Sequence, residues 1–210
     1  MLILIVAATE MEVTPFMKEF PNAEILITGV GTFNTVYELI KKIHSKAYDL
    51  IIQLGIAGSY KAQLNLGEAY LVKEDCFADL GVFEKGNFQT IFEMGFSNQN
   101  DFPFVNGKLE NPYIQSFDIK VYEAKGATVN LLTDDSAYCD VLIEKYKADL
   151  ESMEGAAFHY VCLKEKQVFL QIRGVSNLVG DRNKSHWKIH EAIRASNQIV
   201  IDIYKKYLKK

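Results

Sequence analysis

Residues 151–183 read ESMEGAAFHYVCLKEKQVFLQIRGVSNLVGDRN, and this stretch decides the fold. The small residues from Gly155 onward predict a helix after a short strand end, and the apolar, β-rich run of residues 168–175 predicts a strand. That strand is expected to stop at Ser176 and Asn177, before a polar loop that contains a glycine. Polar side chains therefore stand where strands end, which is where open α/β sheets bind their ligands.

Glu154 and Asn177 are the polar residues at the two ends of this helix–strand unit. The helix dipole favours a carboxylate at a helix start, and an amide after a strand can simply form a turn. Such a structural role explains either residue taken alone. Their separation by one helix–strand unit, followed by the polar segment 180–183, favours a binding or catalytic site.

The rest of the chain continues this alternation of apolar strands and amphipathic helices. Further strands are predicted at residues 2–8, 24–28, 49–54, 68–77, 119–122 and 127–132. Further helices are predicted at residues 9–20, 32–44, 136–147 and 187–208. The alternation predicts an α/β fold, a three-layer α/β/α sandwich around a mixed, largely parallel central sheet, with residues 1–210 forming one domain.

Two further strand ends carry candidate residues. Thr9 can cap the helix that follows the first strand, Pro15 is expected in its first turn, and Glu10 and Glu12 leave the carboxyl end of that strand. The segment 55–58 (GIAG) follows a second apolar strand. Glycines there allow a ligand to approach the backbone closely, although packing alone often explains them.

The composition is that of an ordinary globular protein and excludes several partners. The 210 residues are 49% hydrophobic and 24% charged, with a net charge of −4 and no basic stripe ahead of the last helix, so no nucleic-acid partner is expected. Residues 1–8 are too short to span a membrane and lack the pattern of a signal peptide, so we expect a cytoplasmic protein without membrane contact. Three widely spaced cysteines and four histidines form no metal-ligand pattern, which predicts free thiols and no metal site.

Four segments resemble the nucleoside phosphorylase and nucleosidase superfamily, in order and approximate spacing over nearly the whole chain. Residues 8–13 (ATEMEV) resemble the first loop of that superfamily, and residues 55–58 resemble its Gly-x-Ala-Gly loop. Residues 151–154 (ESME) resemble its Val-Glu-Met-Glu strand end, and residues 173–177 (RGVSN) its Arg-Ala-Ile-Ser-Asp strand end. The runs ESMEGAAF and VSNLVGDRN, with Trp187, look most like the futalosine hydrolases of the superfamily.

The resemblance implies a hydrolase that uses water, without a cofactor, to remove hypoxanthine from futalosine in menaquinone biosynthesis. Glu12 matches the carboxylate that orients and deprotonates the water and stabilises the oxocarbenium-like ribose. Glu154 matches the residue that accepts hydrogen bonds from the ribose hydroxyls, since one carboxylate can hold two donors. Met153 is then expected against the sugar, and Ala57 and Gly58 are expected to contact the substrate.

Asn177 stands where adenine-releasing relatives carry an aspartate that gives a proton to N7 and accepts a hydrogen bond from the 6-amino group. An amide can donate to N7 and O6 of hypoxanthine, whereas an ionised aspartate would face two acceptors. This difference favours a 6-oxopurine over a 6-aminopurine. Ser176 is expected to orient the amide or its loop, and Arg173 is expected to be buried and paired with Glu151 or Glu154.

The reaction type rests on the first loop. Phosphorylases of this superfamily bind phosphate through an arginine there, whereas Glu10 and Glu12 would repel phosphate, so hydrolysis is favoured. Three alternatives stay open: a methylthioadenosine or adenosylhomocysteine nucleosidase, a purine nucleoside phosphorylase, and a non-catalytic nucleoside-binding protein. Between the first strand and Gly29 the chain is shorter than in methylthioadenosine nucleosidases, so part of the sheet edge or pocket wall is expected to differ.

Several features of the expected site stay undecided. Residues 79–115 are rich in phenylalanine and could stack on the aryl group of futalosine or simply pack in the core. Arg182, Lys85 and Lys184 are candidates for binding the aryl carboxylate, and Asp181 could protonate the base or form a turn. Relatives are usually dimers or larger, so we expect a homo-oligomer that binds a small-molecule nucleoside.

Overall fold

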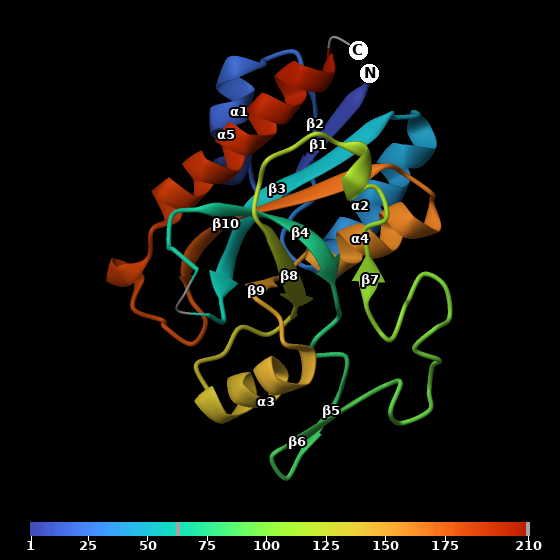
Figure 1. The fold of residues 1–210 in the computed structure, drawn as a ribbon, viewed down its shortest axis with the longest axis vertical. Helices are drawn as coiled ribbons and strands as arrows, with labels where there is room; N and C mark the ends of the chain where they lie inside the picture. Colours follow the sequence, from blue (N-terminus) through green and yellow to red (C-terminus); the bar gives the residue numbers. More distant parts are fainter. Residues whose placement is uncertain (62–63, 209–210) are drawn as a thin grey trace.

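The computed structural model describes residues 1–61 and 64–208 (Figure 1). The strands are β1 (Ile3–Ala7), β2 (Glu24–Ile27), β3 (Leu50–Ser59), β4 (Ala69–Asp75), β5 (Gly81–Glu84), β6 (Asn87–Thr90), β7 (Leu109–Glu110), β8 (Glu123–Thr128), β9 (Leu150–Ser152) and β10 (Phe169–Leu178). The helices are α1 (Glu10–Glu19), α2 (Thr32–Ser45), α3 (Ser136–Tyr146), α4 (Gly155–Lys164) and α5 (Ile189–Leu208), with short 3₁₀ turns at Ile114–Ser116 and Lys184–His186. The predicted alternation of strands and helices is confirmed.

The large sheet has the strand order β10-β4-β8-β9-β3-β1-β2, and β7 pairs with β4. The pairs β1–β2, β1–β3, β3–β10, β4–β8 and β8–β9 are parallel. The pairs β10–β4, β3–β9 and β4–β7 are antiparallel. The predicted mixed, largely parallel sheet is therefore confirmed.

Strand β3 closes part of this sheet on itself. One edge of β3 pairs with β10 along most of its length, while the other edge pairs first with β1 and then, at Gly58 and Ser59, with β9. Because β10 also pairs with β4, the strands β3, β10, β4, β8 and β9 form a closed ring. The carboxyl ends of β3 and β10 run side by side in this ring, and they carry the candidate residues with them.

Helices cover both faces of the sheet (Figure 1). Helices α1 and α5 pack on one face, around a core that includes Ile5, Phe16 and Tyr204. Helices α2 and α4 pack on the other face, around a core that includes Leu39 and Phe158. All five residues of β1 are buried, which explains why its sequence shows no polar alternation.

The strand predictions at residues 119–122 and 127–132 are wrong in position. A single strand, β8, covers Glu123–Thr128, and residues 119–122 lie outside any strand. Ile119 and Val121 are apolar because they pack against the core on the α5 side, not because they belong to the sheet. Residues 131 and 132 are exposed and follow the strand.

Two predicted strand ends are also wrong. Strand β3 continues through residues 55–58 to Ser59, and β10 continues through Ser176 and Asn177 to Leu178. A break in the register between Val175 and Asn177 lets β10 stay paired with β3 while it bends. The polar residues therefore lie within paired strands rather than after them.

One local prediction is corrected as well. Thr9 caps α1 as expected, but the helix begins at Glu10, so Pro15 lies beyond its first turn. Residues 79–115, for which the sequence predicted no strand, contain the β5–β6 hairpin and β7. Among the described residues, no helix combines the length and hydrophobicity needed to cross a bilayer.

Candidate active site

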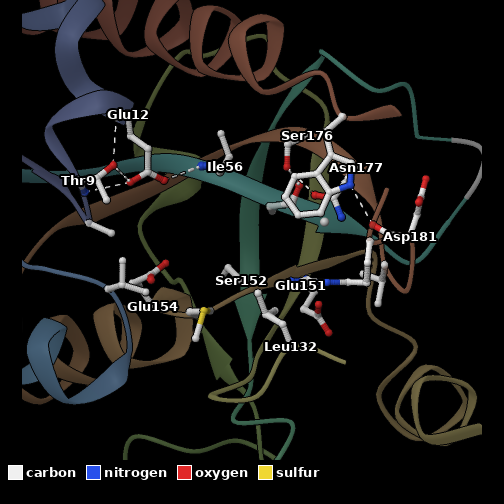
Figure 2. Close-up of a pocket in the computed structure, with 18 of the residues that line it drawn as sticks. Thr9, Glu12, Ile56, Leu132, Glu151, Ser152, Glu154, Ser176, Asn177 and Asp181 are labelled. Atoms are coloured by element: carbon white, nitrogen blue, oxygen red, sulfur yellow. Dashed lines mark hydrogen bonds between the residues drawn. The ribbon is translucent and has the colours of Figure 1, made fainter. Parts of the chain in front are cut away.

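The candidate residues meet in one pocket at the carboxyl ends of β1, β3 and β10 (Figure 2). Seven of the eight residues predicted for the site line this pocket, namely Glu12, Ala57, Gly58, Met153, Glu154, Ser176 and Asn177. The eighth, Arg173, is buried behind the lining. Residues from α1, β3, the connection between β9 and α4, and β10 are thus brought together from positions far apart in the sequence.

Glu12 is held by three hydrogen-bond donors at the start of α1. Its Oε2 accepts from the backbone N–H of Thr9 at 3.0 Å and from the Thr9 hydroxyl at 2.9 Å, and its Oε1 accepts from the N–H of Ile56 at 3.0 Å. Thr9 and Glu12 form a capping box, so the same contacts also fix the first turn of the helix. A carboxylate offers about four acceptor positions, so roughly one is left for a ligand in the pocket.

Burial makes Glu12 a stronger base than an exposed carboxylate. Only 6% of the residue is exposed, and this burial raises the pKa of its carboxyl above the ordinary 4.5. The positive charge of Arg173 and the donors at Ile56 and Thr9 act in the opposite direction but do not cancel the effect. A raised pKa makes a carboxylate a better proton acceptor, as a general base requires.

Glu154 occupies the N-cap position of α4 and also reaches the start of α2. Its Oε1 accepts from the N–H of Gly31 at 3.1 Å, and Arg173 Nη1 donates to its Oε2 at 3.3 Å. Gly31 precedes α2 with a φ of 94°, a conformation that glycine adopts without strain. The negative charge therefore lies at two helix N-termini, where helix dipoles favour it.

Arg173 fills the space that Gly55 leaves open. The two residues are paired in register across β10 and β3. A Cβ atom on Gly55 would lie 2.6 Å from Arg173 Nη1 and 2.8 Å from Glu12 Oε1. Besides its bond to Glu154, the guanidinium donates to Gln53 Oε1 at 3.0 Å. Of the two partners predicted for Arg173, Glu154 is confirmed and Glu151 is wrong.

Asn177 presents its NH₂ group with a fixed orientation. The hydroxyl of Ser176 donates to Asn177 Oδ1 at 2.7 Å, and Asn177 Nδ2 donates to the carbonyl of Leu178 at 2.8 Å. An amide nitrogen carries two hydrogens, so one remains for a ligand. The expectation that Ser176 orients the amide agrees with these contacts.

The remaining candidates separate into two groups. Asp181 and Arg182 line the pocket, whereas Lys85, Lys184 and all of residues 79–115 are absent from its lining. The Asp181 carboxylate accepts from His186 Nδ1 at 2.7 Å and from the N–H of Asn183, which favours the turn role. The hydrogen bond from His186 lowers the pKa of Asp181, which favours the ionised carboxylate and so leaves it without a proton to donate.

The sequence reasoning gave no role in the site to several residues that form the pocket walls, including Trp187, which it used only for the resemblance. Trp187 lines the pocket, donates from its indole to the Asp181 carbonyl at 2.9 Å, and has the Arg182 guanidinium over its ring. Val30, Leu132 and Val179 add apolar surface. These residues lie in loops or beyond strand ends, where hydrophobic periodicity carries no signal.

Comparisons with known proteins agree with this geometry. A family model described as the phosphorylase superfamily matches residues 23–209. A futalosine hydrolase from Thermus thermophilus is 31% identical over 212 residues, covering 91% of this chain and 90% of that protein. A 5′-methylthioadenosine/S-adenosylhomocysteine nucleosidase from Buchnera aphidicola is 25% identical, covering 78% of this chain and 70% of that protein.

Solved structures share the fold. The 5′-methylthioadenosine/S-adenosylhomocysteine nucleosidase of Neisseria meningitidis superposes with a TM-score of 0.78 at 18% identity, covering 97% of this chain and 98% of that one. The futalosine hydrolase of Helicobacter pylori superposes with a TM-score of 0.77 at 16% identity, covering 97% of each chain. At these identities the likeness concerns the fold alone, and the sequence matches carry the assignment. The chain therefore belongs to the phosphorylase superfamily.

Proposed function

We propose that this protein is a nucleosidase that hydrolyses the N-glycosidic bond of futalosine and releases hypoxanthine. The observation that carries the proposal is the convergence of Glu12, Glu154 and Asn177 on one pocket. The 31% identity to a futalosine hydrolase over 91% of the chain supports the choice of substrate. The place in menaquinone biosynthesis is part of the same proposal and rests on the resemblance to futalosine hydrolases.

Glu12 is the general base in this proposal. N-glycoside cleavage passes through an oxocarbenium-like ribose, with water arriving on one face while the purine leaves from the other. The acceptor position that Thr9 and Ile56 leave free on Glu12 takes the proton of that water. The negative charge of the carboxylate also stabilises the cationic sugar.

Glu154 and Met153 hold the sugar. Glu154 is fixed by Gly31 and Arg173, and its remaining acceptor positions bind the ribose hydroxyls. Both residues line the pocket beside Glu12. Holding the sugar at a fixed distance from the base converts a bimolecular reaction into an intramolecular one, which can contribute several kcal/mol.

Asn177 selects the leaving base. Its free N–H donates to N7 or O6 of hypoxanthine, both of which are acceptors. A 6-aminopurine presents an NH₂ group instead of O6, so two donors would then face each other. A buried mismatch of this kind discriminates strongly, by roughly 10⁴ in the best cases.

Water, rather than phosphate, is the proposed acceptor. The buried Glu12 carboxylate and Glu154 place negative charge on the side where an attacking anion would have to lie. Arg173 is near, but it is buried and bonded to Glu154 and Gln53. The site therefore offers little to a second anion.

A methylthioadenosine or adenosylhomocysteine nucleosidase is the second candidate. Two such enzymes match this chain at 25% and 28% identity. Asn177 counts against this candidate, because its free N–H and the 6-amino group of adenine are both hydrogen-bond donors.

Incubation with futalosine, inosine and 5′-methylthioadenosine, without and with phosphate, tests these alternatives by chromatography of the freed base. We expect hypoxanthine from futalosine without phosphate. Faster release of adenine from methylthioadenosine would favour the second candidate. A requirement for phosphate would indicate a phosphorylase, and a bound purine without turnover would indicate a binding protein.

We also propose that the chain forms one catalytic domain that works in the cytoplasm as a homodimer or larger homo-oligomer. The three cysteines are free and buried, as is typical of a reducing compartment. Phe33 and Tyr37 on α2 are 85% and 67% exposed, which leaves an apolar face available for a second copy. Light scattering during gel filtration tests the oligomeric state.

A further inference from the structure

Three buried polar atoms lie behind the pocket without a hydrogen-bond partner. Within residues 1–61 and 64–208, these atoms are His159 Nε2, Gln171 Oε1 and Arg173 Nε. The three residues are 0%, 1% and 1% exposed, so bulk solvent does not reach them. Buried polar atoms in folded proteins are almost always paired, so three together require an explanation.

The three atoms belong to one cluster beneath helix α4. Phe169, Gln171 and Arg173 alternate along β10 and therefore project to the same face of the sheet. The ring of His159 packs against Phe169 on that face, with ring centroids 4.7 Å apart. Burial lowers the pKa of His159 to about 4, and Arg173 and Gln171 lie close enough to act on that pKa as well.

The contact at Nδ1 fixes the tautomer of His159. Nδ1 lies 2.9 Å from the carbonyl oxygen of Leu109, and a carbonyl only accepts, so Nδ1 carries the hydrogen. With a pKa of about 4, the ring is neutral at neutral pH. Nε2 is therefore an acceptor that needs a donor.

Asp75 fixes the orientation of the Gln171 amide. The carboxylate accepts from Gln171 Nε2 at 3.3 Å, and its other oxygen accepts from the Thr128 hydroxyl at 2.9 Å and from the N–H of Cys76 at 2.8 Å. Burial raises the pKa of Asp75 to about 6, so at neutral pH the carboxylate form predominates and takes only donors. Gly155 packs directly on this pair, since a Cβ there would collide with Asp75 Oδ2 and Gln171 Nε2. Gln171 Oε1 is therefore a second acceptor, turned away from the carboxylate.

The number of hydrogens in the cluster indicates what pairs these atoms. His159 Nε2 and Gln171 Oε1 each need a donor, and Arg173 Nε carries a single hydrogen. Direct contacts among the three would therefore leave one acceptor unpaired. A water molecule donates two hydrogens and accepts one, and buried waters typically make about three hydrogen bonds to groups of this kind.

We propose that one buried water molecule donates to His159 Nε2 and Gln171 Oε1 and accepts from Arg173 Nε, so that His159 positions the guanidinium. All three atoms then have a partner of the right kind. His159 lies behind the pocket and is not part of its lining, so it acts through the water and the guanidinium as a positioning residue.

The cation held in this way serves both acids of the pocket. Arg173 Nη1 donates to Glu154 at 3.3 Å and Nη2 donates to Gln53 at 3.0 Å, so the water adds a bond at the third nitrogen. Burial raises the pKa of Glu12, and the positive charge of Arg173 opposes that rise. The role of His159 rests on the proposed function, because it concerns the acids that hold the sugar and take the proton.

A high-resolution crystal structure of the wild-type protein at neutral pH tests the water directly. At that pH Asp75 is mainly ionised and His159 is neutral. We expect an ordered water roughly 2.7–3.2 Å from His159 Nε2, Gln171 Oε1 and Arg173 Nε. A position without density for water, or a Gln171 amide turned to bond His159 directly, would overturn the proposal.

Two substitutions of His159 separate the tasks of its two nitrogens. Asparagine places an NH₂ group near the position of Nδ1, so it keeps a donor for Leu109 but has no atom at the position of Nε2. Glutamine reaches the position of Nε2 with an acceptor oxygen and loses the bond to Leu109. Both lose the ring contact with Phe169, so each variant is the matched control of the other.

The two variants should differ in activity. We expect kcat/KM for futalosine to fall roughly tenfold or more in His159→Asn and to stay within about threefold of the wild type in His159→Gln. The acidic limb of the kcat–pH profile should move to higher pH only in His159→Asn, because a loosened Arg173 opposes the raised pKa of Glu12 less. Equal activities and equal pH profiles in the two variants would refute the positioning role.

The proposed function fails separately from this inference. If the wild-type protein releases no hypoxanthine from futalosine, the reaction itself is wrong, and the crystal structure still decides whether the water is bound. If the wild-type protein hydrolyses futalosine but the two variants behave alike, only the role of His159 is wrong.

Discussion

Replacing Glu12 with glutamine removes the proposed base while keeping the shape of the side chain. The carboxylate now serves Thr9 through one oxygen and Ile56 through the other. Glutamine has a single acceptor oxygen, so the backbone N–H of either Thr9 or Ile56 loses its partner. Leaving one such buried donor unsatisfied costs about 1–3 kcal/mol, which sets the expected loss of stability.

The loss of activity should be larger than the loss of stability. Removing a general base costs roughly 10²–10⁴ in rate, or about 3–5 kcal/mol in activation free energy. We expect Glu12→Gln to show this fall in kcat while hypoxanthine still binds. Single-turnover release of the base measures the first quantity, and calorimetric titration with hypoxanthine measures the second.

The pH dependence of the wild-type enzyme gives a further check on Glu12. Burial raises its pKa above the ordinary 4.5, and the base must be ionised, so activity should fall as the pH drops through a value above 4.5. Glu12→Gln should lose this acidic limb. Glu10→Gln is the matched control, because Glu10 is exposed in the same turn of α1 and should leave rate and pH profile unchanged. Turnover in Glu12→Gln within about twofold of the wild type would refute the role of Glu12.

Three further substitutions test two other residues near the site and one buried carboxyl of the sheet. Asn177→Asp should raise the ratio of kcat/KM for the 6-amino analogue of futalosine to kcat/KM for futalosine by roughly tenfold or more, since it exchanges a donor for an acceptor. An unchanged ratio would contradict the role of Asn177. Asp75 is fully buried, and burial raises its pKa from 3.8 to about 6, so its contribution to stability is present below 3.8 and is lost as the pH rises through about 6. This shift corresponds to about 3 kcal/mol, and Asp75→Asn should remove that decline from a series of denaturant midpoints measured against pH. Gly55→Ala should reduce kcat although Glu12 and Glu154 are kept, because the alanine Cβ would lie 2.6 Å from Arg173 Nη1 and 2.8 Å from Glu12 Oε1. Activity at the wild-type level would show that the guanidinium has room to move.

Much of the fold was predictable because its strands are covered on both faces. The apolar runs of β1 and the first half of β3 carry no polar alternation, and the structure buries them completely. The closure of the ring was not predictable, because it depends on β3 exchanging β1 for β9 as a neighbour at Gly58 and Ser59. Nothing local in the sequence records a pairing between residues about ninety positions apart.

The sequence predicted which residues form the site better than it predicted the contacts that they make. Motif resemblance identified Glu12, Glu154 and Asn177, and all three line one pocket. For the glycine at position 55 the sequence left open whether a ligand or packing explains it, and the structure uses the room for the side chain of Arg173. A glycine signal shows that something approaches closely, but it does not say whether a substrate or a distant side chain does so.

The arrangement of charges suggests why two carboxylates in one pocket can have different tasks. Arg173 donates directly to Glu154, so the acid assigned to the sugar has a cationic partner. Glu12 receives neutral N–H and O–H donors, and it feels Arg173 only through space. Burial therefore raises the pKa of Glu12, because no direct ion pair compensates its charge. On the proposed function, this asymmetry makes Glu12 the residue that can take a proton and leaves Glu154 to hold the substrate.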